Sequence, residues 1–196
     1  MTNWYPEHTS MYEDVQTVNQ HMNDPEEKRL KIYHRASRDS ARTPVQWTAG
    51  ENAGFSEHEP WFYVNENYKT VNVESEERDP ESLLNFYRKA VGLRKSLPVI
   101  RDGKYREYRK LSGRVYLYER YMEESSGSNK NEDPQRVLVM VSFSDKPEKI
   151  RLPKGFDPEK ASLLLGSYPE KEREALQPDG TVLFRPYEAR VYGFPS

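Results

Sequence analysis

The chain is organised around the stretch Arg38-Asp39-Ser40-Ala41-Arg42-Thr43-Pro44-Val45-Gln46-Trp47. Pro44 fixes its own φ and biases the residue before it toward extended backbone, so the polar side chains are presented from a loop and not from a helix face. A guanidinium such as that of Arg42 offers a fork of donors to carboxylates or to neighbouring hydroxyls. The indole of Trp47 offers an apolar face to a flat partner. Taken alone, an R-D-x-x-R pattern predicts a buried, ion-paired loop more often than a binding site.

Composition and charge exclude several classes of protein. The 196 residues allow one or two small domains. Charged residues make up 32% of the chain and the hydrophobic set 35%, which is polar for a domain that must bury its own core, since roughly 45–50% apolar (glycine included) is typical. The formal net charge is -2 with acid and base interspersed, so nothing predicts a nucleic-acid partner.

Metal, cofactor and membrane signals are missing from the sequence. There is no cysteine, hence no disulfide framework, thiolate zinc site or cysteine nucleophile. The four histidines lack metal-ligand spacing, and no glycine-rich phosphate loop or calcium loop is found. We therefore expect no metal and no cofactor. Without a signal peptide or an apolar run of ~20 residues, we expect no membrane association and a cytoplasmic protein.

The first half of the chain predicts loops and helices. Residues 1–35 have the pattern of a polar loop followed by helical segments, with a helix start at Asp24-Pro25-Glu26-Glu27. Residues 36–78 are mostly loop and rich in aromatics. Residues 79–97 predict a helix that begins at Asp79-Pro80 and has apolar side chains over half its surface. Arg94 lies near the centre of that apolar arc, so we expect it to form a structural ion pair.

The second half has the period-2 alternation of strands from Arg101 onward. Residues 104–110 and 114–122 predict a hairpin. Residues 136–144 are apolar on both faces, as in a central strand. Further short strands are predicted at 149–152, 162–165, 181–184 and 190–194. Together they predict an antiparallel β-sandwich.

The full string of motifs resembles the α-glucosidases of the α-amylase superfamily (glycoside hydrolase family 13), in the oligo-1,6-glucosidase and maltase-isomaltase group. Arg38–Trp47 is similar to the segment just after the last barrel strand in that family. The other similar segments are Asn52-Ala53-Gly54-Phe55, Pro60-Trp61, Val64-Asn65, Asn67-Tyr68, Asn72-Val73-Glu74, Asp79-Pro80-Glu81-Ser82, Leu93-Arg94-Lys95 and Arg185-Pro186-Tyr187-Glu188-Ala189. The resemblance covers essentially the whole chain.

This resemblance implies an α+β fold in two parts. Residues 1–98 would be the C-terminal remnant of a catalytic (β/α)8 barrel, with a substrate-side loop at 36–78 and the last barrel helix at 79–97. Residues 99–196 would be a C-terminal β-sandwich domain. The rest of the barrel would be missing, because Met1-Thr2-Asn3 resembles the point at which the chain of the family leaves its eighth strand.

The resemblance also implies which residues touch substrate. Retaining glycoside cleavage needs a nucleophilic carboxylate and an acid/base carboxyl about 5–5.5 Å apart. The family carries these residues on barrel strands that would precede Met1, so we expect no catalytic residue in this chain. Arg42 matches the arginine that binds the innermost sugar, and Arg38 and Asp39 match positions that shape the same loop. The resemblance thus implies that Arg42 and Arg38 bind substrate. An oligosaccharide or disaccharide would be the partner of the full-length parent, and a complementary barrel fragment could be a further partner.

Several interpretations stay open on sequence alone. The chain could be a truncated gene product, the result of a misplaced start codon, or half of a split enzyme. It could instead be a non-catalytic carbohydrate-binding or interaction module built on the β-sandwich. An amino-acid-transporter heavy chain shares the barrel and lacks activity, but it needs a membrane anchor, and no anchor is visible in the sequence.

Overall fold

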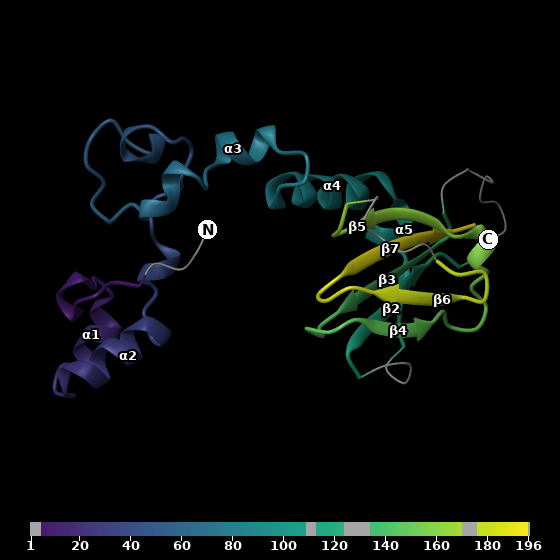
Figure 1. Ribbon diagram of the computed structural model, residues 1–196, viewed down its shortest axis with the longest axis horizontal. Helices are drawn as coiled ribbons and strands as arrows, with labels where there is room; N and C mark the ends of the chain where they lie inside the picture. The colour runs from purple at the N-terminus through teal and green to yellow at the C-terminus, as the bar shows by residue number, and fades with distance from the viewer. Residues whose placement is uncertain (1–4, 109–112, 124–133, 170–175, 196) are drawn as a thin grey trace. The chain divides into compact units, whose positions relative to one another are not determined.

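The structure, a computed structural model, describes residues 5–108, 113–123, 134–169 and 176–195 (Figure 1). The chain divides into two compact units, Met1–Leu84 and Asn85–Ser196, and each is described by itself. The domain boundary expected after residue 98 stays a prediction. In the described ranges no helix is long and apolar enough to cross a membrane.

The first unit consists of short helices joined by long loops. Its α-helices are α1 (Val15–His21), α2 (Glu26–Ala36) and α3 (Val73–Arg78). Single 3-10 turns are η1 (Thr9–Met11), η2 (Asp39–Ala41), η3 (Glu51–Gly54) and η4 (Glu66–Lys69). The helix start predicted around Pro25 is confirmed, because α2 begins at Glu26 with two glutamates in its first turn.

Helix α3 is a finding that the sequence did not predict, since residues 36–78 were expected to be mostly loop. A capping box starts it: the Asn72 side chain accepts a hydrogen bond from Ser75 N at 2.9 Å, and the Ser75 hydroxyl accepts one from Asn72 N at 3.3 Å. Two backbone donors at the helix start are satisfied in this way. The amides of Val73 and Glu74 donate in addition to Gln46 O at 2.9 Å and Trp47 O at 3.0 Å, so the start of α3 is fixed by the box and by the arginine loop together.

The predicted helix at 79–97 begins later than expected. The observed helix, α4, spans Leu83–Ser96. Asp79 starts a turn and not the helix: Ser82 N donates to Asp79 O at 3.1 Å, and Glu81 N donates to Asp79 Oδ1 at 2.9 Å. The carboxylate of Glu76 accepts from Leu84 N at 3.2 Å, so Glu76 and not Asp79 satisfies this free amide at the helix start.

The expectation of an ion pair at Arg94 is wrong. Arg94 is exposed, and it forms no ion pair with any residue that the structure describes. The apolar arc of α4 is covered on one side only: Leu93 packs into a buried cluster, whereas Tyr87 is 66% exposed and Val91 37% exposed. Arg94 lies on the uncovered side, where water solvates its charge.

The second unit is built on two antiparallel sheets (Figure 1). A short helix, α5 (Pro98–Asp102), precedes them. The five-stranded sheet has the order β1-β2-β3-β7-β5 and the two-stranded sheet pairs β4 with β6. The strands are β1 (Lys104–Glu107), β2 (Val115–Tyr121), β3 (Arg136–Ser142), β4 (Glu148–Arg151), β5 (Ser162–Gly166), β6 (Thr181–Phe184) and β7 (Ala189–Phe194). All the predicted strands are found, including the central position of β3, although β1 ends at Glu107. Residues 109–112, which include the end of the predicted strand 104–110 and part of its turn, lie outside the described ranges.

One hydrophobic core joins the two sheets. It takes Leu117 from β2, Leu138 and Met140 from β3, Ile150 from β4 and Val182 from β6. Alternation along β3 sends Leu138 and Met140 to this core and the intervening valines to the other face. A second, smaller cluster on that other face consists of Leu97, Val99 and Val137, with partly buried neighbours.

Candidate functional site

A buried carboxylate, Asp14, organises the first half of the arginine motif. Asp14 is 1% exposed. Its oxygens accept from Arg38 Nη2 at 2.5 Å, Arg38 Nε at 3.2 Å and Arg38 N at 3.0 Å, and from Thr17 Oγ1 at 3.0 Å. The hydrogen bond from the Arg38 guanidinium holds the pKa of Asp14 well below its usual range, although burial acts in the opposite direction.

Asp39 is buried as well and fastens the same loop to the start of α1. Its Oδ2 accepts from Glu13 N at 2.9 Å and from Asp14 N at 3.1 Å. Its Oδ1 is buried and has no hydrogen-bond partner among the described residues. Arg38 and Asp39 therefore form a structural cross-link between two segments that lie about 25 residues apart in sequence.

Arg42 differs from Arg38 in this respect. Its backbone amide donates to Asp39 O at 2.9 Å, which ends the 3-10 turn η2. Its side chain is exposed and contacts no hydrogen-bonding or ionic partner in the part of the chain that the structure describes. The motif thus contains one arginine committed to the fold and one whose donors are available. The interpretation of the isolated motif as an ion-paired loop holds for Arg38, although only its partner Asp14 is buried, and it fails for Arg42.

The end of the motif is held by a strained turn. Gln46 is buried, and its Nε2 donates to Val71 O at 2.6 Å. Trp47 N donates to Ala53 O at 2.8 Å, while the indole stays 49% exposed. Asn52 and Ala53 have φ of 50° and 56°, a region that non-glycine residues rarely adopt. Because such strain persists only where surrounding contacts enforce it, this turn fixes the backbone on which Trp47 is displayed.

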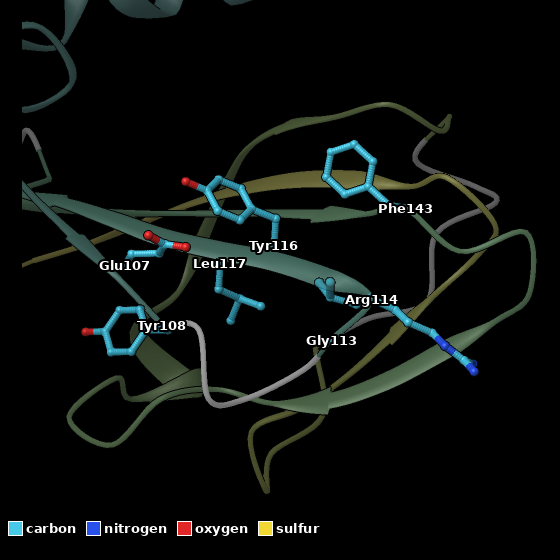
Figure 2. Close-up of a pocket in the computed structure, with 8 residues that line it drawn as sticks. Glu107, Tyr108, Gly113, Arg114, Tyr116, Leu117 and Phe143 are labelled. Carbon is cyan, nitrogen blue, oxygen red and sulfur yellow. The ribbon is translucent and has the colours of Figure 1, made fainter.

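The structure contains a cavity of about 250 Å³ in the second unit, but its lining does not favour catalysis. Figure 2 shows that Tyr116 and Phe143 lie on one side of β2, whereas Leu117 and Tyr108 lie on the other. Leu117 belongs to the hydrophobic core. Glu107 supplies the one carboxylate in the lining, and glycoside cleavage requires two. Among the described residues, no group of three or more His, Cys, Asp or Glu side chains could hold a metal ion.

The known proteins to which this chain is similar match it over nearly its whole length. Residues 3–103 match the alpha amylase catalytic domain. The oligo-1,6-glucosidase of Parageobacillus thermoglucosidasius is 35% identical over 188 residues, which are 92% of this chain and 31% of that protein. Trehalulose synthase from Pseudomonas mesoacidophila MX-45 superposes with a TM-score of 0.79 at 28% identity, over 98% of this chain and 33% of that one. Trehalose-6-phosphate hydrolase of Bacillus licheniformis superposes with a TM-score of 0.78 at 32% identity, over 100% and 34%.

The sheets, the helices and the arginine loop therefore constitute part of an alpha-amylase fold. The chain belongs to the alpha-amylase family of glycoside hydrolases (family 13). It spans about a third of the length of the relatives it matches.

The role of Asp14 as the buried partner of Arg38 was not predicted from the sequence. A signal was present, because Asp14 directly precedes α1 and aspartate is a common helix N-cap. Its side chain makes no cap hydrogen bond and accepts hydrogen bonds from Arg38 and Thr17 instead. The sequence could thus have marked Asp14 as a helix start, but not as the partner of Arg38.

Proposed function

We propose that this chain is the C-terminal part of a retaining α-glucosidase that hydrolyses terminal α-linked glucose from maltose, isomaltose or short oligosaccharides. In this proposal residues 1–98 complete the catalytic (β/α)8 barrel and residues 99–196 form the C-terminal β-sandwich domain. The nucleophile and the acid/base come from a segment outside this sequence, so the chain alone is inactive. The cytoplasmic location is part of the same prediction.

The contrast between the two arginines carries the proposal. Arg38 is neutralised by Asp14, whereas the Arg42 guanidinium is exposed and uncommitted within the described residues. A planar fork of donors matches the adjacent hydroxyls of a sugar. Arg42 therefore binds the non-reducing glucose in this proposal, and Arg38 supports the loop without touching sugar. The names of the relatives favour glucosides as substrates.

The test measures glucose release from maltose, isomaltose and sucrose. The chain alone should release none above buffer. The chain co-expressed with the first two thirds of the Parageobacillus thermoglucosidasius relative should release glucose from at least one of these sugars. Arg42→Ala should remove most of that rate, whereas Arg42→Lys, which keeps the positive charge but loses the planar fork, should retain only part of it. Turnover by the chain alone, abolished in Arg42→Ala, would refute the expectation that the carboxylates lie elsewhere.

A non-catalytic carbohydrate-binding or interaction module is the second candidate. Exposed aromatics on the second unit favour it, since Tyr105 is 48% exposed and Tyr116 40% exposed and aromatic faces stack on flat partners. Isothermal titration of the chain with isomaltose separates the two candidates. Tight binding by the full chain that Arg42→Ala leaves unchanged would favour the module.

A further inference from the structure

The turn that joins β6 to β7 holds a tyrosine in a strained backbone conformation (Figure 1). It lies within the segment Arg185-Pro186-Tyr187-Glu188-Ala189, and Glu188 N donates to Arg185 O at 3.2 Å. With proline at its second position and a φ of 55° at Tyr187, its third, the turn has the features of a type II turn, which favours glycine at that third position. A tyrosine there adopts the left-handed region at an energetic cost that glycine avoids.

A buried ion pair imposes this conformation on the turn. Glu188 and Arg190 are both buried; Glu188 Oε1 accepts from Arg190 Nε at 2.7 Å, and its Oε2 accepts from Arg190 Nη2 at 3.0 Å. Glu188 Oε2 also accepts from Arg185 N at 2.8 Å, and Tyr187 N donates to Ser144 O at 3.0 Å. These contacts fix the backbone before, at and after Tyr187, so the unfavourable φ persists.

The ring of Tyr187 gains little from burial, because the residue is 65% exposed. The other described non-glycine residues with positive φ are Asn52 and Ala53. Both are compensated: Ala53 is fully buried, and the Asn52 side chain donates to Ser56 O at 3.2 Å. No hydrogen bond joins the Tyr187 side chain to any residue in the part of the chain that the structure describes. Strain held at an exposed side chain in this way indicates a functional constraint.

The groups that the turn presents suit a sugar. The exposed phenol ring of Tyr187 offers an apolar face to the C–H face of a pyranose. The Arg185 guanidinium lies 5.2 Å from the centre of the Tyr168 ring, whose hydroxyl donates to Pro186 O at 3.0 Å. A stacked guanidinium keeps its N–H groups at its edge, where they can donate to neighbouring hydroxyls. Because Pro186 is half-buried and Glu188 is buried, the turn itself presents one ring and not the wide apolar surface of a protein interface.

We propose that the β6–β7 turn binds an α-glucan chain, with the ring of Tyr187 stacked on one glucose unit and Arg185 donating to the hydroxyls of that unit. Membership of a glycoside hydrolase family makes an α-linked glucan the first ligand to test. The inference goes beyond the proposed glucosidase, because it concerns binding by the second unit and requires no catalytic carboxylate. It also differs from a module based on Tyr105 and Tyr116, since those rings extend from the regular strands β1 and β2.

The test is affinity electrophoresis of the full chain in native gels that contain amylopectin, beside a reference protein that binds no glucan. Amylopectin should retard the wild type. Tyr187→Gly and Tyr187→Ala should each raise the Kd by about tenfold, the loss expected for one stacked ring, whereas Tyr187→Phe should keep most of the binding. Arg185→Gln should also weaken binding. The matched control is Tyr105→Ser: Tyr105 is an exposed tyrosine of the same unit in a regular strand, so retardation should equal that of the wild type.

Stability separates a binding role of Tyr187 from a structural one. Tyr187→Gly removes the ring and the strain together, so the urea midpoint of the second unit should not fall, whereas Tyr187→Ala keeps the strain and should unfold at a lower midpoint than Tyr187→Gly. A lower midpoint in Tyr187→Gly than in the wild type would make the ring structural and overturn the proposal. So would a wild type that amylopectin does not retard, unchanged retardation of Tyr187→Gly, or an equal loss in Tyr105→Ser. Because no glucose release is measured, this result stands apart from the test of the proposed function.

Discussion

Replacing Asp14 with asparagine should destabilise the first unit selectively. The oxygens of Asp14 accept three hydrogen bonds from Arg38 and one from Thr17. In Asp14→Asn one acceptor becomes an amide donor that faces the donors of Arg38. Breaking a fully buried ion pair costs about 3–5 kcal/mol. Because the Arg38 side chain is 54% exposed and can regain water, we expect about 2–3 kcal/mol at pH 7, near the cost of losing one or two charged hydrogen bonds.

Tryptophan fluorescence measures this change without interference from the second unit. All three tryptophans, Trp4, Trp47 and Trp61, lie in the first unit. A urea titration followed by fluorescence therefore reports the free energy of unfolding of that unit. Far-UV circular dichroism records both units, so the part of its change that fluorescence does not follow reports the second unit. Glu74→Gln is the matched control, because Glu74 pairs with Arg78 on the exposed surface; such an i,i+4 pair is worth about 0.3–0.5 kcal/mol.

The same variant should show a defined pH dependence. The folded-state pKa of Asp14 is depressed, so its contribution is complete above the unfolded value of about 3.9 and is lost as pH falls toward the folded value. The difference between wild type and Asp14→Asn should therefore be constant from pH 5 to 7 and shrink below pH 4. A difference no larger than that of Glu74→Gln, or one that persists unchanged at pH 3, would refute the role assigned to Asp14.

Two further substitutions test the local structure of each unit. Asn72→Ala removes the capping box of α3 and should cost about 1 kcal/mol in the fluorescence-detected transition; an unchanged urea midpoint would show that α3 does not depend on its cap. Glu188→Ala leaves Arg190 buried without the carboxylate that accepts from its Nε at 2.7 Å, so it should cost about 3–5 kcal/mol in the circular-dichroism transition. A fluorescence transition that moved as much as the circular-dichroism one would contradict the assignment of this pair to the second unit alone.

The strands were predictable because their alternation has a local cause. In β3 the side chains of Leu138 and Met140 point to the core between the sheets, and those of Val137 and Val139 pack on the outer cluster. A strand buried on both faces must be apolar at every position, and its short length distinguishes it from a helix. Each pattern could be interpreted within a window of a few residues, without knowledge of the partner strand.

The errors in the helices have a common origin in partners distant along the chain. Asp79-Pro80 is a valid helix start by local rules, but the carboxylate of Glu76, in the preceding helix, accepts from the free amide of Leu84 at the start of α4. At Arg94 the helical pattern locates the apolar arc, yet it cannot say which half of the arc is covered. That choice is made by contacts of Leu93 with the sheet, and a helical wheel does not contain this information.

The arginine loop shows the same limit at the candidate site. Arg38 and Arg42 are equivalent by residue type, and their difference comes from Asp14, which lies 24 residues before Arg38. The resemblance to the family made Arg42 the first candidate for sugar binding, which stays a prediction, and the physical reason for the difference between the two arginines requires the structure.

The buried residues around the arginine motif fix the backbone from which Arg42 extends. The buried side of the first unit is largely polar, with Asp14, Asp39 and Gln46 each at most 2% exposed, and hydrogen bonds rather than an apolar core fix its loops. The carbonyl of Asp39 accepts from Arg42 N, while its carboxylate is held by two backbone amides at the start of α1. The position of the Arg42 backbone is therefore set before any sugar binds. Under the proposed function, such preorganisation reduces the conformational entropy lost when Arg42 binds a sugar, so a substitution at Asp39 should weaken that binding through the Arg42 backbone.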